Sequence, residues 1–68
     1  MDKRQKLIKL IEHYKKHNVE HAHSYNELVP MASDIGNSRL AEVLEKLTHE
    51  SKKLTSLFEE ALSILRKE

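Results

Sequence analysis

The sequence predicts an all-α fold, an antiparallel helical hairpin of which two copies form a four-helix bundle. Three observations support this prediction. Apolar residues recur every three or four positions in two long segments, which is the periodicity of amphipathic helices. The only glycine, Gly36, lies between these segments. The chain has 68 residues and no cysteine, so we expect a single domain over residues 1–68 without disulfides.

The first segment is expected to form a helix over about residues 3–34. Asp2 is a candidate N-cap, and Gln5 three residues later completes a capping box. The apolar residues of this segment define one helix face: Leu7, Leu10, Ile11, Tyr14, Tyr25, Leu28, Val29 and Ala32. Pro30 lies on the opposite face, where the loss of one backbone hydrogen bond predicts a kink and not the end of the helix.

A turn is expected at about residues 35–37. Gly36 suits the left-handed position that follows many helices, because it carries no Cβ. Asn37 or Ser38 can then cap a second helix over about residues 38–66. The apolar residues of that helix are Leu40, Val43, Leu44, Leu47, Leu54, Leu57, Phe58, Ala61, Leu62 and Leu65. So short a connection makes the two helices antiparallel neighbours.

The second helix is apolar over a wider arc than one neighbouring helix can cover. Leu57, Leu62 and Ile64 flank its central apolar residues. A hairpin of this length also buries little apolar surface by itself. We therefore expect a homodimer, two hairpins related by a two-fold axis in a four-helix bundle. The alternative is a three-helix monomer with a turn near Asn18, although residues 3–29 contain neither glycine nor proline.

Polar residues interrupt both apolar faces at the same height of the expected hairpin. Helical periodicity places Asn18 and His21 on the core side of the first helix, with His17 at its edge. On the second helix Ser51 points inward and Glu50 lies at the edge. In a dimer this polar layer of Asn18, His21, Glu50 and Ser51 would set the interface, as buried polar residues fix register in coiled coils.

The same residues support a second hypothesis, a metal site. Imidazoles four residues apart project from one side of a helix, so His17 and His21 together can chelate one ion. Glu50 from the facing helix supplies an oxygen ligand. Two nitrogens and one oxygen suit zinc, nickel or iron, so the cofactor of this hypothesis is a divalent transition metal.

Composition and motifs argue against several other functions. The formal net charge is +1, and acidic residues interleave with the lysines of the first helix, so no nucleic-acid partner is expected. No apolar run is long enough to span a membrane, and the absence of cysteine fits the cytoplasm. A zinc-protease motif needs glutamate directly after His17, where the chain has Asn18. We assign no catalytic residue and expect no enzyme.

The segment HNVEHA at residues 17–22, followed by Tyr25, resembles the HN-x-x-HA signature of a family of small uncharacterised prokaryotic helical-hairpin domains. In that family a leucine-rich second helix follows a short turn that contains glycine. The likeness extends over nearly the whole chain. The resemblance implies signature positions at His17, Asn18 and His21, a link to nickel or cobalt handling in some members, and no settled function.

The function expected from the sequence is that of a small cytoplasmic assembly or adaptor module. It forms a homodimer through the polar layer and its apolar surroundings, and it binds a further protein where it acts as an adaptor. The alternative is a module that binds or delivers zinc, nickel, cobalt or iron through the histidines of the first helix.

Overall fold

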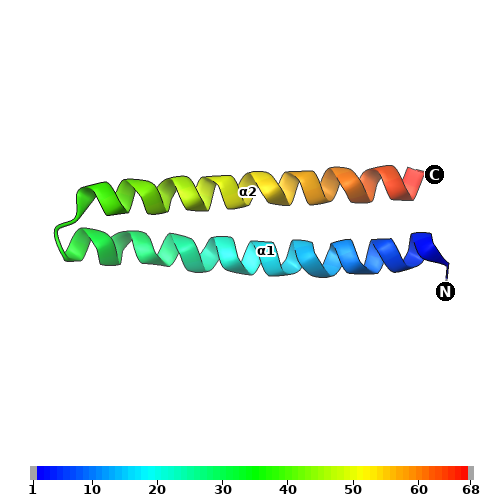
Figure 1. Ribbon diagram of the computed structural model, residues 1–68, viewed down its shortest axis with the longest axis horizontal. Helices are drawn as coiled ribbons and strands as arrows, with labels where there is room; N and C mark the ends of the chain where they lie inside the picture. Colours follow the sequence, from blue (N-terminus) through cyan, green and yellow to red (C-terminus); the bar gives the residue numbers. More distant parts are fainter. Residues whose placement is uncertain (1, 68) are drawn as a thin grey trace.

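Two long helices lie side by side in the computed structural model, which describes residues 2–67 (Figure 1). Helix α1 comprises Lys3–Asp34 and helix α2 comprises Ser38–Lys67. The helices are antiparallel, and both termini lie at the end of the molecule opposite the turn (Figure 1). The prediction of an all-α antiparallel hairpin is therefore confirmed. Residues 1 and 68 of the expected domain lie outside the described residues.

The start of α1 depends on the predicted cap. The carboxylate of Asp2 accepts a hydrogen bond of 2.8 Å from the backbone N–H of Gln5, which satisfies one of the free donors at the helix start. Further along, Pro30 lies inside α1, and the helix continues to Asp34. Pro30 therefore does not end the helix, and the expected kink stays a prediction.

The turn ends one helix and caps the next within three residues. Gly36 has a φ of 78°, the left-handed conformation expected for it. Its N–H bonds to the carbonyl of Ser33 at 2.9 Å, and the N–H of Asn37 bonds to that of Ala32 at 3.0 Å, which together form a Schellman motif. The side chain of Asn37 also accepts a hydrogen bond of 2.9 Å from the N–H of Leu40. Asn37 is thus the N-cap of α2, and only residues 35–37 connect the two helices.

Small residues fill much of the seam between the two helices. Seam positions alternate in steps of three and four, as in a coiled coil. They are Ile8, Ile11, Lys15, Asn18, Ala22, Tyr25, Val29 and Ala32 on α1, and Ala41, Leu44, Thr48, Ser51, Thr55, Phe58, Leu62 and Leu65 on α2. Among the buried residues of the described chain, Leu62 is the one large side chain, and the others are alanine, threonine or serine. This seam is a narrow core.

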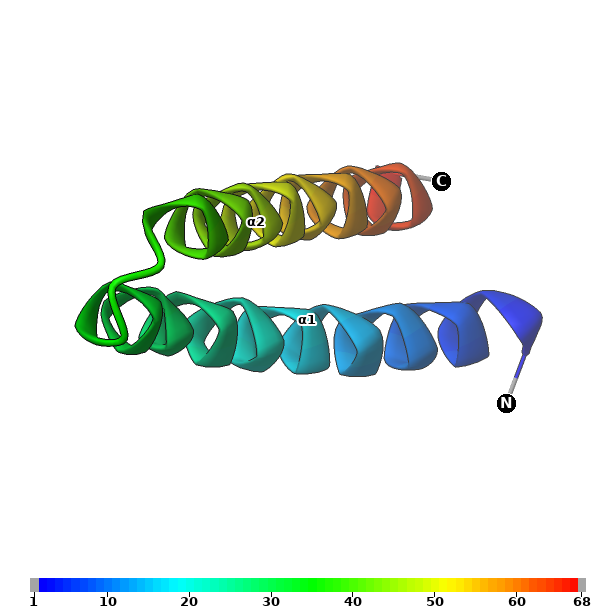
Figure 2. The same ribbon diagram turned by 60° about the vertical axis from the view of Figure 1, so that its left-hand side comes forward.

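The hairpin is a thin, elongated body and not a compact one (Figure 2). Its Cα radius of gyration is 15.8 Å, compared with about 11 Å for a compact domain of this length. Its accessible surface is 5467 Å², compared with about 4,500 Å² for a compact monomer of the same mass. The chain therefore exposes about 1,000 Å² more than a compact monomer would.

Most of the exposed large apolar side chains lie on one side of the hairpin. Those on the helices each come one residue before a seam position, which rotates them to the same side on both antiparallel helices, and Ile35 of the turn lies next to Leu28 and Leu40 on that side. We name this side the apolar face. Its members are Leu7, Leu10, Tyr14, Leu28, Met31 and Ile35 from α1 and the turn, and Leu40, Val43, Leu47, Leu54, Leu57 and Ile64 from α2. Within residues 2–67, these side chains remain exposed to solvent.

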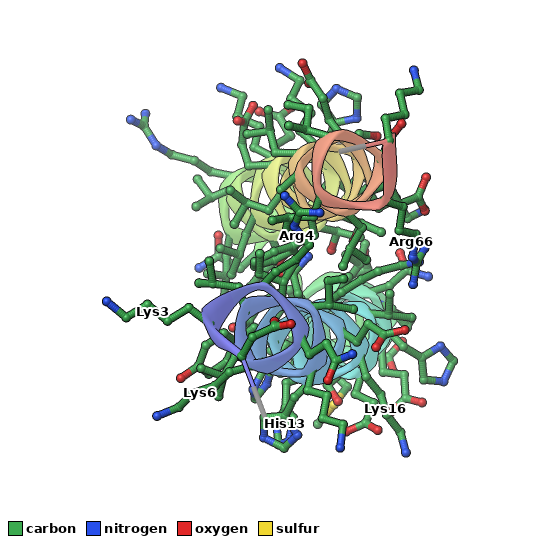
Figure 3. All side chains as sticks on the ribbon, turned by 90° about the vertical axis from the view of Figure 1, so that its right-hand side faces the viewer. Lys3, Arg4, Lys6, His13, Lys16 and Arg66 are labelled. Carbon is green, nitrogen blue, oxygen red and sulfur yellow. The ribbon has the colours of Figure 1, made fainter. Side chains whose placement is uncertain are left out.

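The opposite side, which we name the polar face, carries residues that follow seam positions by one. The carboxylate of Glu12 and the guanidinium of Arg66 pair at 2.9 Å across the two helices, and the ammonium of the seam residue Lys15 pairs with the carboxylate of Glu59 on this side at 3.7 Å. Figure 3 shows Arg66 on this side of the hairpin, with Lys3 on the other side. Over the described residues, neither helix is long and apolar enough to cross a membrane.

This division into two faces differs from the single apolar face expected for each helix. Leu7, Leu10 and Tyr14 were expected to face the core together with Ile11, but they are exposed, whereas Ile11 lies in the seam. The physical reason is the width of the apolar arc. It covers two adjacent stripes on each helix, and one neighbouring helix can bury only one of them.

Candidate functional site

Asn18 connects the two helices at the middle of the seam. Its side-chain amide donates a hydrogen bond of 2.6 Å to the carbonyl oxygen of Ser51 and one of 2.8 Å to the hydroxyl oxygen of Thr55. The hydroxyl of Thr55 in turn donates to the Ser51 carbonyl at 3.4 Å. We call these three residues the inner polar layer. It links α1 to α2 through groups that water would otherwise solvate.

Buried side chains around the inner polar layer are also hydrogen-bonded. The hydroxyl of the neighbouring buried Thr48 donates to the carbonyl of Leu44 at 2.9 Å. Among the described residues, no buried side-chain nitrogen or oxygen lacks a hydrogen-bond partner. Hydrogen bonds between the helices, such as those of Asn18, fix which residues of the two helices face each other. The role of the inner polar layer is structural.

Replacing Asn18 with alanine is expected to destabilise the protein by about 1–2 kcal/mol, because two hydrogen bonds between the helices are lost. The matched control is Asn26→Ala, which makes the same exchange at an exposed position of α1 and has the same effect on helix propensity. The two variants would be compared by urea denaturation at one chain concentration. Equal stabilities would contradict the assigned role of Asn18.

A row of four rings crosses the outer surface of α1. The ring centroids of His13 and His17 are 4.3 Å apart, those of His17 and His21 are 6.4 Å apart, and His21 stacks on Tyr25 at 6.0 Å and 17°. Each step of four residues rotates the side chain by about 40° around the helix. The row therefore runs from His13, which points away from α2 (Figure 3), to Tyr25 in the seam.

His17, His21 and Glu50 form an outer polar layer on the apolar face. Each comes one residue before a seam position, as the leucines of this face do. His21 and Glu50 line the same hollow of about 460 Å³ between the helices, together with Leu47 and Leu54. The outer layer therefore lies beside the inner layer, at the middle of an otherwise apolar surface.

The four residues of the predicted polar layer thus divide into two pairs. Asn18 and Ser51 meet in the seam, whereas His21 and Glu50 are exposed on the apolar face. Sequence reasoning missed Thr55, whose hydroxyl oxygen accepts a hydrogen bond from the side-chain amide of Asn18. The available signal was its place after Thr48 and Ser51 in the three-and-four spacing of the second helix, which marks it as a seam residue.

The predicted metal ligands do not form a complete site within one chain. No group of three or more His, Cys, Asp or Glu side chains in the described part of the chain could hold a metal ion. The carboxylate of Glu50 pairs with the ammonium of Lys53 at 3.2 Å, and both side chains are mostly exposed. Such surface ion pairs contribute little to the free energy of folding. The contact with Lys53 therefore leaves the Glu50 carboxylate available to another partner.

The segment at residues 17–22 contributes to both layers. Asn18 and Ala22 lie in the seam, whereas His17 and His21 lie on the apolar face. The fold and these two polar layers define a helical hairpin with one hydrogen-bonded seam and one exposed apolar face. The chain belongs to the family described as a domain of unknown function (DUF8180), whose model matches residues 7–65. The match includes most of both helices and the whole turn. No curated protein and no solved structure matches the chain.

Proposed function

We propose that the protein is a self-assembly module in which the apolar face of one hairpin packs against that of a second copy. The observation that carries this proposal is the apolar face itself, which extends along both helices. The surface exposed beyond that of a compact monomer, about 1,000 Å², is close to the 800 Å² or so that each partner buries in a stable interface. The product is a four-helix bundle.

The charges that border the apolar face favour a second copy with both turns at the same end. In that arrangement the two-fold axis runs along the bundle, and α1 of each hairpin faces α2 of the other. Residues at equal height then have numbers that add up to about 72, because Asn18 contacts Ser51 and Thr55 and the turn is centred on Gly36. Opposite charges meet at three heights, in the pairs Glu20 with Lys53, Glu27 with Lys46, and Asp34 with Arg39, whereas like charges meet at one height, in the pair Lys6 with Lys67.

The other two-fold arrangement, with the turns at opposite ends, mixes like and opposite charges. There α2 faces α2 of the second copy, so Lys53 lies near the partner's Lys53 and Arg39 near the partner's Lys67, while Lys46 lies near the partner's Glu60. Juxtaposed like charges oppose association. The charge pattern therefore supports the arrangement with both turns at one end.

The outer polar layer gives the proposed dimer its register. In the arrangement above, His21 of each hairpin lies at the height of the partner's Glu50. An imidazole and a carboxylate that meet in an apolar interface form a hydrogen bond, and a shift in register would leave both buried without a partner. We further propose that the HN-x-x-HA pattern at residues 17–22 marks the dimer interface. The family that carries this pattern would then consist of cytoplasmic prokaryotic proteins that dimerise in the same way.

The test uses sedimentation equilibrium and a distance between spin labels. The chain has no cysteine, so Ser33→Cys provides a single labelling site near the turn. We expect a dimer of two 8.0 kDa chains and a label distance shorter than about 35 Å. With turns at opposite ends, the distance would exceed about 45 Å because of the helix length.

Lys16→Cys is the matched control for the spin-label measurement. This exposed position lies near mid-height of α1, so its labels lie at similar distances in either arrangement and report dimerisation alone. A monomer in sedimentation at all concentrations would overturn the proposed function. A dimer with distant Ser33→Cys labels would overturn the arrangement.

A further inference from the structure

We infer that the dimer holds two divalent transition-metal ions, each bound by His17 and His21 of one hairpin and by Glu50 of the partner subunit. This inference rests on the proposed function, because a single chain does not complete the site. Among the described residues of one chain, no three potential ligands are close enough to bind an ion. The second copy supplies the missing ligand.

The histidine pair supplies two of the ligands. The ring centroids of His17 and His21 are 6.4 Å apart, whereas two imidazoles on one ion, with nitrogen–metal distances of about 2.1 Å, have centroids roughly 5 Å apart. Both side chains are exposed, so small rotations about their side-chain bonds can close the gap. The pair is therefore close to the chelating geometry before any ion binds.

The carboxylate comes from the second copy because of the way the apolar faces meet. On one hairpin, His17 and Glu50 lie on the outer stripes of the apolar face, with the inner stripes of both helices between them. In the proposed dimer, α2 of the partner lies against these histidines, and the partner's Glu50 is at the height of His21. The surface pair of Glu50 with Lys53 opens at little cost when the carboxylate binds an ion.

The surroundings suit a metal ion. Leu47 and Leu54 line the hollow beside His21, and in the dimer the opposing apolar face covers it. Removal of water strengthens the attraction between a divalent ion and a carboxylate. Two neutral imidazoles and one carboxylate are a ligand set that zinc and nickel accept, with a fourth position for water or an exogenous ligand.

The first experiment measures Zn²⁺ binding to chelator-stripped protein without a histidine tag, in competition with a chromophoric chelator. We expect one ion per chain. His17→Ala/His21→Ala and Glu50→Gln should each weaken binding by about 100-fold or more, because each removes a ligand. His23→Ala is the matched control and should bind as the wild type does, since His23 lies on the polar face near Glu27.

The decisive experiment mixes the two defective variants. In a heterodimer of His17→Ala/His21→Ala with Glu50→Gln, one of the two sites combines an intact histidine pair with an intact Glu50. Random pairing makes half of the dimers heterodimers, so the mixture should recover about a quarter of the wild-type capacity. Native mass spectrometry verifies that heterodimers form. A site made within one chain would recover no capacity.

The outcomes distinguish this inference from the proposed function. A protein that sediments as a monomer with and without Zn²⁺ would overturn both. A dimer that binds no Zn²⁺, or one whose mixed variants form heterodimers without recovering capacity, would overturn the metal site and leave the assembly module in place. Recovery of about a quarter of the capacity supports both.

Discussion

Leu47→Glu is expected to convert the protein from a dimer into a monomer. Leu47 is 43% exposed in the single hairpin and lies at the centre of the apolar face. In the proposed dimer both copies would bury the new carboxylate, and an unpaired buried charge costs several kcal/mol. The dissociation constant should therefore rise by about 1,000-fold or more. Sedimentation equilibrium over a range of concentrations measures this change directly.

The matched control for this substitution is Val19→Glu. Val19 is exposed to a similar degree, 47%, but it lies on the polar face next to His23 and Lys52. This variant should remain a dimer, and circular dichroism should show that both variants stay helical. If Val19→Glu and Leu47→Glu changed the dissociation constant equally, the apolar face would not be the interface.

The helix ends could be predicted because their chemistry is local. The cap at Asp2, the left-handed Gly36 and the capping role of Asn37 each depend on residues within four positions along the chain. Such short-range rules do not require knowledge of how the helices pack. The antiparallel hairpin then follows from the length of the turn.

The seam could not be predicted in detail, because each helix has two apolar stripes and periodicity does not state which one faces the other helix. Large residues such as Leu10 and Leu47 were natural candidates for the core, yet the hairpin buries Ala22 and Ala41 instead. Small side chains allow close packing of two helices. The larger residues remain exposed on the apolar face, which the sequence indicated only through the width of the apolar arc.

For the predicted polar layer, too, periodicity did not show which residues lie in the seam and which lie on the apolar face. Asn18 and His21 differ by three positions, and a helical wheel places both near the core side. Their environments differ because a seam is only about two stripes wide: Asn18 bonds to Ser51 and Thr55, whereas His21 is exposed beside Glu50. The position of the turn predicted that these residues lie at the same height along the hairpin. It did not predict which of them face the other helix and which are exposed.

His21→Leu is expected to tighten the dimer. In the proposed interface, His21 and the partner's Glu50 are desolvated polar groups, and replacing part of such a layer with a well-packed apolar residue is often neutral or stabilising by about 1–4 kcal/mol. The leucine extends the apolar face formed by Leu28 and Leu47. Both copies change, so the dissociation constant should fall by about tenfold or more. Dilution of a fluorescently labelled protein measures such tight dimers.

The gain in affinity should be accompanied by a loss of specificity. Without His21, a shifted register no longer buries an unpaired imidazole, so the Ser33→Cys label distances should become broader than in the parent protein. His23→Leu makes the same exchange on the polar face and should change neither the dissociation constant nor the distances. A weaker dimer for His21→Leu would show that the polar pair contributes net affinity. In that case the histidine would stabilise the assembly as well as align it.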